Sequence, residues 1–134
     1  MKTIESRSDI ENLIHNFYCK IRSDETLGPI FNSMIDDWPK HESKLVDFWE
    51  TNLFVRIKYK GNPVKVHQEV DLKTRGHIHQ GLFFRWLQLW YETIDELFEG
   101  ELAALAKARA RKMATHLFMK VFMARQKYVD KHIF

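Results

Sequence analysis

Apolar side chains recur every three or four residues along most of this chain, and this pattern constrains the fold more than any other feature. Spacing of this kind places apolar residues on one face of an amphipathic α-helix. No stretch alternates apolar and polar residues as a half-buried strand does. We therefore expect an all-α protein. In the first long segment the apolar residues are Ile10, Leu13, Ile14, Phe17, Tyr18 and Ile21.

Capping and turn residues mark where the predicted helices begin and end. Ser8 and Glu11 match a capping box, which predicts a helix start at Ser8. Gly28-Pro29 predicts a break, followed by a short helical turn over 30–35. Trp38-Pro39 predicts the start of a second long helix, because proline suits the first turn. The other predicted elements are a loop over 58–63, a short helix over 64–70, a polar connector to His79, a third long helix with an apolar stripe from Phe83 to Phe98, a break at Gly100, and a last helix from Glu101 to Phe122.

The composition fits a small globular domain. The chain has 134 residues and is 45% hydrophobic, with only 5 Gly and 3 Pro, which argues against a loop-dominated or all-β protein. At this length roughly 68% of the unfolded surface can be buried, so a core can form without covalent staples. The sequence contains no repeat and no linker-like stretch. We expect a single domain over 1–134.

Cys19 is the only cysteine, so neither a disulfide within the chain nor a cysteine-rich zinc module can form. We expect a small buried or half-buried thiol there rather than a nucleophile. The first residues lack the apolar stretch of a signal peptide, and no run approaches the ~18 apolar residues of a membrane span. We therefore expect a cytoplasmic protein that does not enter a membrane.

Aromatic side chains and histidines are abundant, with 10 Phe, 4 Trp, 4 Tyr and 7 His, whereas common catalytic motifs are absent. His41 shares a helical face with Phe48 and Trp49. A single histidine on such a face is more often a core residue than a ligand. His67 alone, on a short segment, is most often a surface residue. Neither histidine by itself predicts a site.

Taken together, the motifs resemble those of the group III truncated haemoglobins. The likeness runs from Ser8 to Phe122, with the motifs in the family's order. It implies a compact helical globin that encloses a haem b, with 1–7 and 125–134 as terminal extensions. The motifs that carry the resemblance are Phe17-Tyr18, Leu27-Gly28-Pro29-Ile30-Phe31-Asn32, Trp38-Pro39-Lys40-His41, Phe48-Trp49, Gly61-Asn62-Pro63, His67, the run from Phe83 to Trp90, and Leu97-Phe98.

The resemblance also implies roles around the haem iron. His67 matches the proximal histidine that ligates the metal and leaves it five-coordinate. Tyr18, His41 and Trp86 match the distal residues that surround and stabilise a bound gas. The family's position for His41 is variable, so this side chain either stays in the pocket, swings out of it, or binds ferric iron.

A further set of residues is expected to contact the porphyrin. By resemblance, Phe31 matches an aromatic residue packed against the ring, and Trp49 matches a bulky residue of the distal helix. Leu45 and Phe48 share that helical face with His41 and are expected to line the haem. Lys44 lies where a globin often places a cation for a haem propionate.

Elementary chemistry agrees with these expectations. A flat apolar disc held non-covalently needs a slot lined by aromatic and aliphatic groups, and its iron needs one oriented neutral imidazole. The sequence has no Cys-x-x-Cys-His run, which excludes covalent attachment. The hydroxyl of Tyr18 and the indole of Trp86 can both donate hydrogen bonds to a bound gas, each contributing about 1.5–3 kcal/mol. We therefore expect tight oxygen binding with slow release.

One segment departs from the family pattern. After His67 the family usually carries a Leu-Pro pair, whereas residues 70–79 contain no proline and two additional histidines, His77 and His79. These imidazoles either face solvent, contact a propionate, or offer a rival ligand to the iron. Solvent exposure is the simplest interpretation.

The expected ligands are diatomic gases: dioxygen, with nitric oxide and carbon monoxide as further candidates. A polar distal pocket favours chemistry on oxygen, nitric oxide or peroxide over bulk transport, because hydrogen bonds polarise the bound molecule. Peroxidase-like or nitric-oxide-detoxifying turnover would need an external electron donor, so enzymatic activity is left open. The length fits a monomer.

The alternative function is a small basic helical module that binds nucleic acid or protein without a cofactor. The net charge of +3 is mild and does not by itself argue for nucleic acid. The support for this alternative is the set of cations in the last predicted helix and just after it: Lys107, Arg109, Arg111, Lys112, Lys120, Arg125 and Lys127. A DNA-binding protein usually clusters such cations along one side of a short recognition helix, whereas here they spread around a long one. We therefore expect no nucleic-acid partner.

Overall fold

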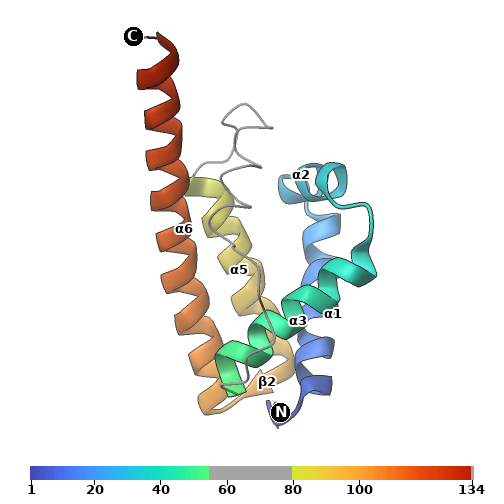
Figure 1. Cartoon of the computed structure of the whole chain (residues 1–134). Coiled ribbons are helices and arrows are strands. Elements are labelled where there is room, and N and C mark those ends of the chain that lie inside the picture. Colours follow the sequence, from blue (N-terminus) through green and yellow to red (C-terminus); the bar gives the residue numbers. More distant parts are fainter. Residues whose placement is uncertain (55–79, 134) are drawn as a thin grey trace.

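The structure is a computed structural model that describes residues 1–54 and 80–133, with side chains for 1–54 and 81–117 (Figure 1). The short helix expected over 64–70, the connector after it, and His67, His77 and His79 lie outside the described residues. The described part is dominated by α-helix, as the sequence predicts. The elements in order are β1 (Lys2–Thr3), α1 (Arg7–Ser23), α2 (Leu27–Met34), α3 (Trp38–Phe54), α5 (Gln80–Leu97), β2 (Phe98–Glu99) and α6 (Glu101–Ile133).

Helix α1 begins two residues earlier than expected, because Ser6 and not Ser8 is its N-cap. Asp9 takes the acidic position of this capping box and accepts hydrogen bonds from the backbone N–H groups of Ser6 (3.2 Å) and Glu5 (2.8 Å). Lys2 lies 2.6 Å from the same carboxylate. The Lys2 ammonium and these N–H groups outweigh the opposing effect of burial and hold the pKa of Asp9 below its usual range.

Helix α2 begins at Leu27, so Gly28-Pro29 lies inside its first turn and not at a break before it. Proline is tolerated there because the first N–H groups of a helix have no partner within it. Gly28 is required by packing: a Cβ at this position would lie 2.7 Å from the backbone oxygen of Arg22. The missing side chain lets α2 approach the end of α1.

A two-residue parallel pair joins β1, near the N-terminus, to β2, between α5 and α6, where the sequence predicts no strand. Lys2 pairs with Phe98, and Thr3 pairs with Glu99. Ile4, just after β1, is buried in the core. Gly100 follows β2 with a φ of 98°, a conformation that favours glycine, and α6 begins directly after it. The pair is too short for alternation to reveal it.

The core lies where α1 packs against α3 and α5, and where α5 packs against α6 (Figure 1). Trp90 is fully buried at its centre and its indole N–H donates to the carbonyl oxygen of Ala106, at 3.2 Å. This bond ties α5 to α6. Within the described residues, no helix is long and apolar enough to cross a membrane.

The last helix is longer than predicted. The apolar pattern predicts an end near Phe122, whereas α6 continues to Ile133 and comprises 33 residues. At 1.5 Å per residue its length is roughly 50 Å. Figure 1 shows its C-terminal part extending past the end of α5.

Candidate functional site

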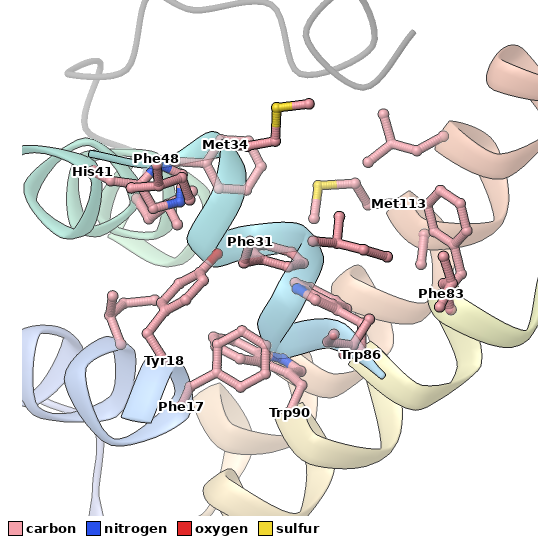
Figure 2. Close-up of a pocket in the computed structure, with 18 of the residues that line it drawn as sticks. Phe17, Tyr18, Phe31, Met34, His41, Phe48, Phe83, Trp86, Trp90 and Met113 are labelled. Carbon is pink, nitrogen blue, oxygen red and sulfur yellow. The ribbon is translucent and has the colours of Figure 1, made fainter. Parts of the chain in front are cut away.

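A cavity of about 360 Å³ opens between the helices, a size typical of small-molecule sites (Figure 2). Helices α1, α2, α3, α5 and α6 all contribute to its wall. Most of its lining is aliphatic or aromatic. The described lining residues are Ile14, Phe17, Tyr18, Leu27, Ile30, Phe31, Met34, Ile35, His41, Leu45, Phe48, Trp49, Leu82, Phe83, Trp86, Trp90, Met113, Ala114 and Leu117.

Tyr18 projects from α1 into this cavity, and its hydroxyl points toward the open space (Figure 2). The side chain is only 4% exposed, whereas a tyrosine at the edge of an apolar stripe ordinarily keeps its hydroxyl in water. Burial raises the pKa of Tyr18 well above its usual value, although a hydrogen bond from Trp86 acts in the opposite direction. The phenol therefore keeps its proton at physiological pH.

His41 enters the same cavity from α3. Its ring centroid lies 5.3 Å from that of Tyr18, with the two planes at 84°, an edge-to-face contact. Three polar side chains from three different helices thus line the cavity: Tyr18 from α1, His41 from α3 and Trp86 from α5.

Stacked aromatic rings form one wall of the cavity. Trp90 lies parallel to Trp86 at a centroid distance of 5.9 Å and stacks on Trp49 at 4.8 Å. Phe17 meets both Trp86 (5.2 Å) and Trp90 (4.9 Å) edge to face. These contacts hold Trp86 in a defined orientation beside Tyr18.

Helix α2 also lines the cavity, and an ion pair between Arg85 and Asp24, the C-cap of α1, fastens the segment just before α2 to α5. Arg85 places Nε and Nη2 each 2.7 Å from Oδ1 of Asp24. The other carboxylate oxygen accepts the backbone N–H groups of Thr26 (3.1 Å) and Leu27 (3.0 Å) at the start of α2. Burial alone would raise the pKa of Asp24, but the Leu27 N–H and the Arg85 guanidinium outweigh it and lower that pKa.

Most of the residues singled out in the sequence meet at this cavity. Tyr18, His41 and Trp86 line it, and so do Phe31, Leu45, Phe48 and Trp49. Lys44 is exposed on α3 and is not among the described lining residues. His67 lies outside the described residues.

Several residues of the site were not identified from the sequence. Met34 from α2 and Met113 from α6 lie at the cavity, although the motifs gave neither of them a role (Figure 2). Trp90 was expected only as core and is both core and wall. Trp38 was noted as a helix start and as part of a family motif but was given no role in the site, yet its ring contacts both Tyr18 (5.5 Å) and His41 (5.7 Å). A helical stripe identifies which residues are buried but not which of them border a hollow.

Cys19 is exposed, contrary to the expected buried or half-buried thiol, and it is not among the described residues that line the cavity. It follows Tyr18 directly on α1, so it points away from the face that Tyr18 buries. Across residues 1–54 and 81–117, no three His, Cys, Asp or Glu side chains gather closely enough to hold a metal ion. A metal carried by a cofactor, with a single protein ligand, is compatible with that finding.

The cavity fits a haem in its chemistry. A porphyrin is a flat apolar group that needs aromatic and aliphatic walls, and this lining is mostly of those two kinds. A gas held beside the porphyrin needs hydrogen-bond donors, and the phenol of Tyr18 and the indole of Trp86 are donors. The donor set is small and sits among apolar groups, as such a site requires.

Comparisons with known proteins agree with this fit. No family model matches the chain. The sequence is 34% identical over 119 residues to a protein of Campylobacter jejuni described as group 3 truncated hemoglobin ctb, covering 86% of this chain and 89% of the relative. The fold matches a crystal structure of a group III truncated hemoglobin from Campylobacter jejuni with a TM-score of 0.80 and 31% identity, over 90% of this chain and 95% of the other. The chain therefore belongs to the group III truncated haemoglobins and has their all-α globin fold.

Proposed function

We propose that the protein holds haem b in the cavity between α1, α3 and α5 and binds dioxygen, or another diatomic gas, on the side of Tyr18. The observation that carries this proposal is the convergence of Tyr18, His41 and Trp86 in a cavity that is otherwise largely apolar. When bound, the haem supplies an iron that takes the gas as a ligand. We propose that His67 would hold this iron through its imidazole.

Tyr18 is the main hydrogen-bond donor in this proposal. Because its pKa is raised by burial, the phenol is protonated throughout the physiological range and can donate. In this proposal the indole N–H of Trp86, which lowers the pKa of Tyr18, faces the acceptor side of the Tyr18 hydroxyl, so the hydroxyl proton is available to the cavity. Trp86 therefore acts on the gas mainly through Tyr18, and the two donors form a chain whose members polarise each other.

His41 stands at the other side of Tyr18 and borders the space proposed for the gas. Its imidazole can donate or accept a hydrogen bond, depending on the nitrogen that carries the proton. Phe31, Leu45, Phe48 and Trp49 supply apolar contact area for the porphyrin. Lys44, exposed on the same helix, is available for a propionate at the edge of the haem.

A buried donor chain slows the release of gas, which suits reaction of the bound molecule better than bulk transport. We propose chemistry on oxygen, nitric oxide or peroxide, with an external electron donor for any repeated turnover. We also propose that the protein acts as a monomer.

The proposal is tested by loading the purified chain with haemin and passing it through gel filtration. A Soret band that travels with the protein, and that changes reversibly when the reduced protein meets oxygen, is the expected result. A chain that stays colourless after haemin addition would falsify the proposal. His41→Ala is expected to retain the Soret band while changing the rate of gas binding, whereas loss of haem in that variant would reverse the roles assigned to His41 and His67.

A further inference from the structure

We infer that Trp38 is a positioning residue that holds His41 beside Tyr18, and that Arg22 clamps Trp38 in place. Neither Trp38 nor Arg22 is among the described residues that line the cavity. The inference rests on the proposed function for its consequence, because the side chain being positioned borders the proposed gas site. The geometry that carries it is independent of any haem.

The rings of Trp38, His41 and Tyr18 form a closed triangle. Trp38 lies 5.5 Å from Tyr18 at an interplanar angle of 52°, and 5.7 Å from His41 at 88°. The third side, between Tyr18 and His41, is 5.3 Å. Each ring therefore contacts the other two, so rotation of the imidazole away from Tyr18 disturbs both contacts of His41.

Helix periodicity explains why these residues meet. Trp38 and His41 are three residues apart on α3, and Tyr18 and Arg22 are four apart on α1, so each pair shares a helix face. The guanidinium carbon of Arg22 lies 4.6 Å from the ring centroid of Trp38, within the range of a cation–π contact. Trp38, the first residue of α3, is thus fastened to α1 at two points.

Trp38 is half-buried and Arg22 is exposed, so their contact lies between the cavity and the surface. His41 would have to move past Trp38 or Tyr18 to leave the cavity on that side. Shortening Trp38 removes one ring contact of the imidazole and leaves space beside it. We therefore expect His41 to be held near Tyr18 in the native protein and to become mobile when Trp38 is truncated.

The chemical accessibility of His41 measures directly how firmly Trp38 holds it beside Tyr18. The full chain, without haemin, is treated with diethyl pyrocarbonate, and the modification rate of His41 is followed by mass spectrometry relative to that of the exposed His116 on α6. Trp38→Ala is expected to raise this ratio by about fivefold or more, and Trp38→Phe by less than about twofold, because phenylalanine keeps an edge-to-face partner. Arg22→Gln is expected to fall between them.

Two matched variants separate positioning from a general loss of stability. Lys40→Gln removes an exposed cation near Trp38 that makes no ring contact in the described part of the chain, and it is expected to leave the ratio unchanged. Phe98→Leu shortens a buried aromatic of β2, directly after the end of α5, and is expected to lower the melting temperature without raising the ratio. If Trp38→Ala does not fold, the comparison of Arg22→Gln with Lys40→Gln decides the question.

A spectroscopic signature in the haem-loaded protein supplies the second readout. Carbon monoxide added to the reduced protein gives an infrared C–O band that responds to the polar groups facing it. We expect a second band in Trp38→Ala, from molecules in which His41 has moved, and a single band in Trp38→Phe and Lys40→Gln.

The two proposals fail in distinguishable ways. If the native chain does not take up haemin, the proposed function is wrong, and the modification rates still decide the role of Trp38. If haem binds but Trp38→Ala matches the native chain in both readouts, the positioning role is wrong. If Phe98→Leu raises the ratio of the His41 to the His116 modification rate as much as Trp38→Ala does, the positioning role is also wrong, because such a rise would reflect only general destabilisation.

Discussion

The indole of Trp86, on α5, and the almost fully buried hydroxyl of Tyr18, on α1, border the same cavity, and the indole N–H lowers the pKa of the phenol as a nearby hydrogen-bond donor does. An indole N–H in this position faces the acceptor side of the hydroxyl and leaves the hydroxyl proton for another partner. Phe17 and Trp90 pack against Trp86 and limit its movement. The arrangement prepares a donor before any ligand arrives, so little reorganisation is needed when one binds.

Removing the Tyr18 hydroxyl is expected to speed oxygen release. In Tyr18→Phe the bound gas loses a hydrogen bond of about 1.5–3 kcal/mol, so the dissociation rate should rise by roughly tenfold or more. Stopped-flow displacement of oxygen by carbon monoxide measures this rate. The matched control is Tyr91→Phe, a half-buried tyrosine of α5 that is not among the described lining residues. An unchanged rate in Tyr18→Phe would rule out the donor role.

Truncating Trp86 should act through Tyr18. Trp86→Phe keeps an aromatic ring in the stack but removes the N–H, so oxygen dissociation is expected to rise by less than in Tyr18→Phe. In the double variant the two effects should not add, since Trp86 has no hydroxyl left to orient. Fully additive effects on the free energy of activation would show instead that Trp86 contacts the gas independently.

Adding a methyl group at Gly28 should destabilise the fold. The new Cβ of Gly28→Ala would lie 2.7 Å from the backbone oxygen of Arg22, so α2 has to move away from α1. The expected loss is about 1–3 kcal/mol of unfolding free energy, as for other overpacked positions. Urea unfolding measures it. Ser33→Ala, an exposed change on the same helix, should stay within about 0.5 kcal/mol of the native chain.

The Asp24 carboxylate should contribute stability that depends on pH. The pKa of Asp24 is lower in the folded protein than in the unfolded chain, where it is about 3.9. The stabilisation is therefore complete above the unfolded-state pKa and is lost as the pH falls through the folded-state pKa. Asp24→Asn should lower the unfolding free energy by about 1–3 kcal/mol at pH 7. The difference from the native chain should shrink below about pH 4. A difference that stays constant down to pH 2 would contradict this account.

The long helices are the part of the fold most readily predicted from the sequence, because each has an apolar face that repeats over many residues. The boundaries were less predictable. Ser6 and Ser8 each have an acidic residue three positions later, Asp9 and Glu11 respectively. Tertiary contacts, including that of Lys2 with Asp9, decide in favour of Ser6. The pairing of Lys2 with Phe98 depends on residues far apart in the chain, and two-residue strands leave no pattern.

The candidate site followed from the family resemblance and not from periodicity. Tyr18 and Trp86 look like ordinary core residues in a helical stripe, and only their shared border with a cavity distinguishes them from buried residues such as Leu13 or Ile94. Trp38 illustrates the limit of both approaches. Its contacts with Tyr18 and His41 arise from the crossing of α1 and α3, which neither the stripe nor the motif describes.

A haemin titration tests the central claim most directly. Trp49, Trp86 and Trp90 all border the cavity, so haem bound there should quench tryptophan fluorescence while the Soret band grows. The account predicts that both signals saturate together near one haem per chain, that His67→Ala loses the Soret band on gel filtration, and that His116→Ala behaves like the native chain. Absence of saturation, or a His67→Ala chain that keeps its haem as firmly as the native protein, would contradict it.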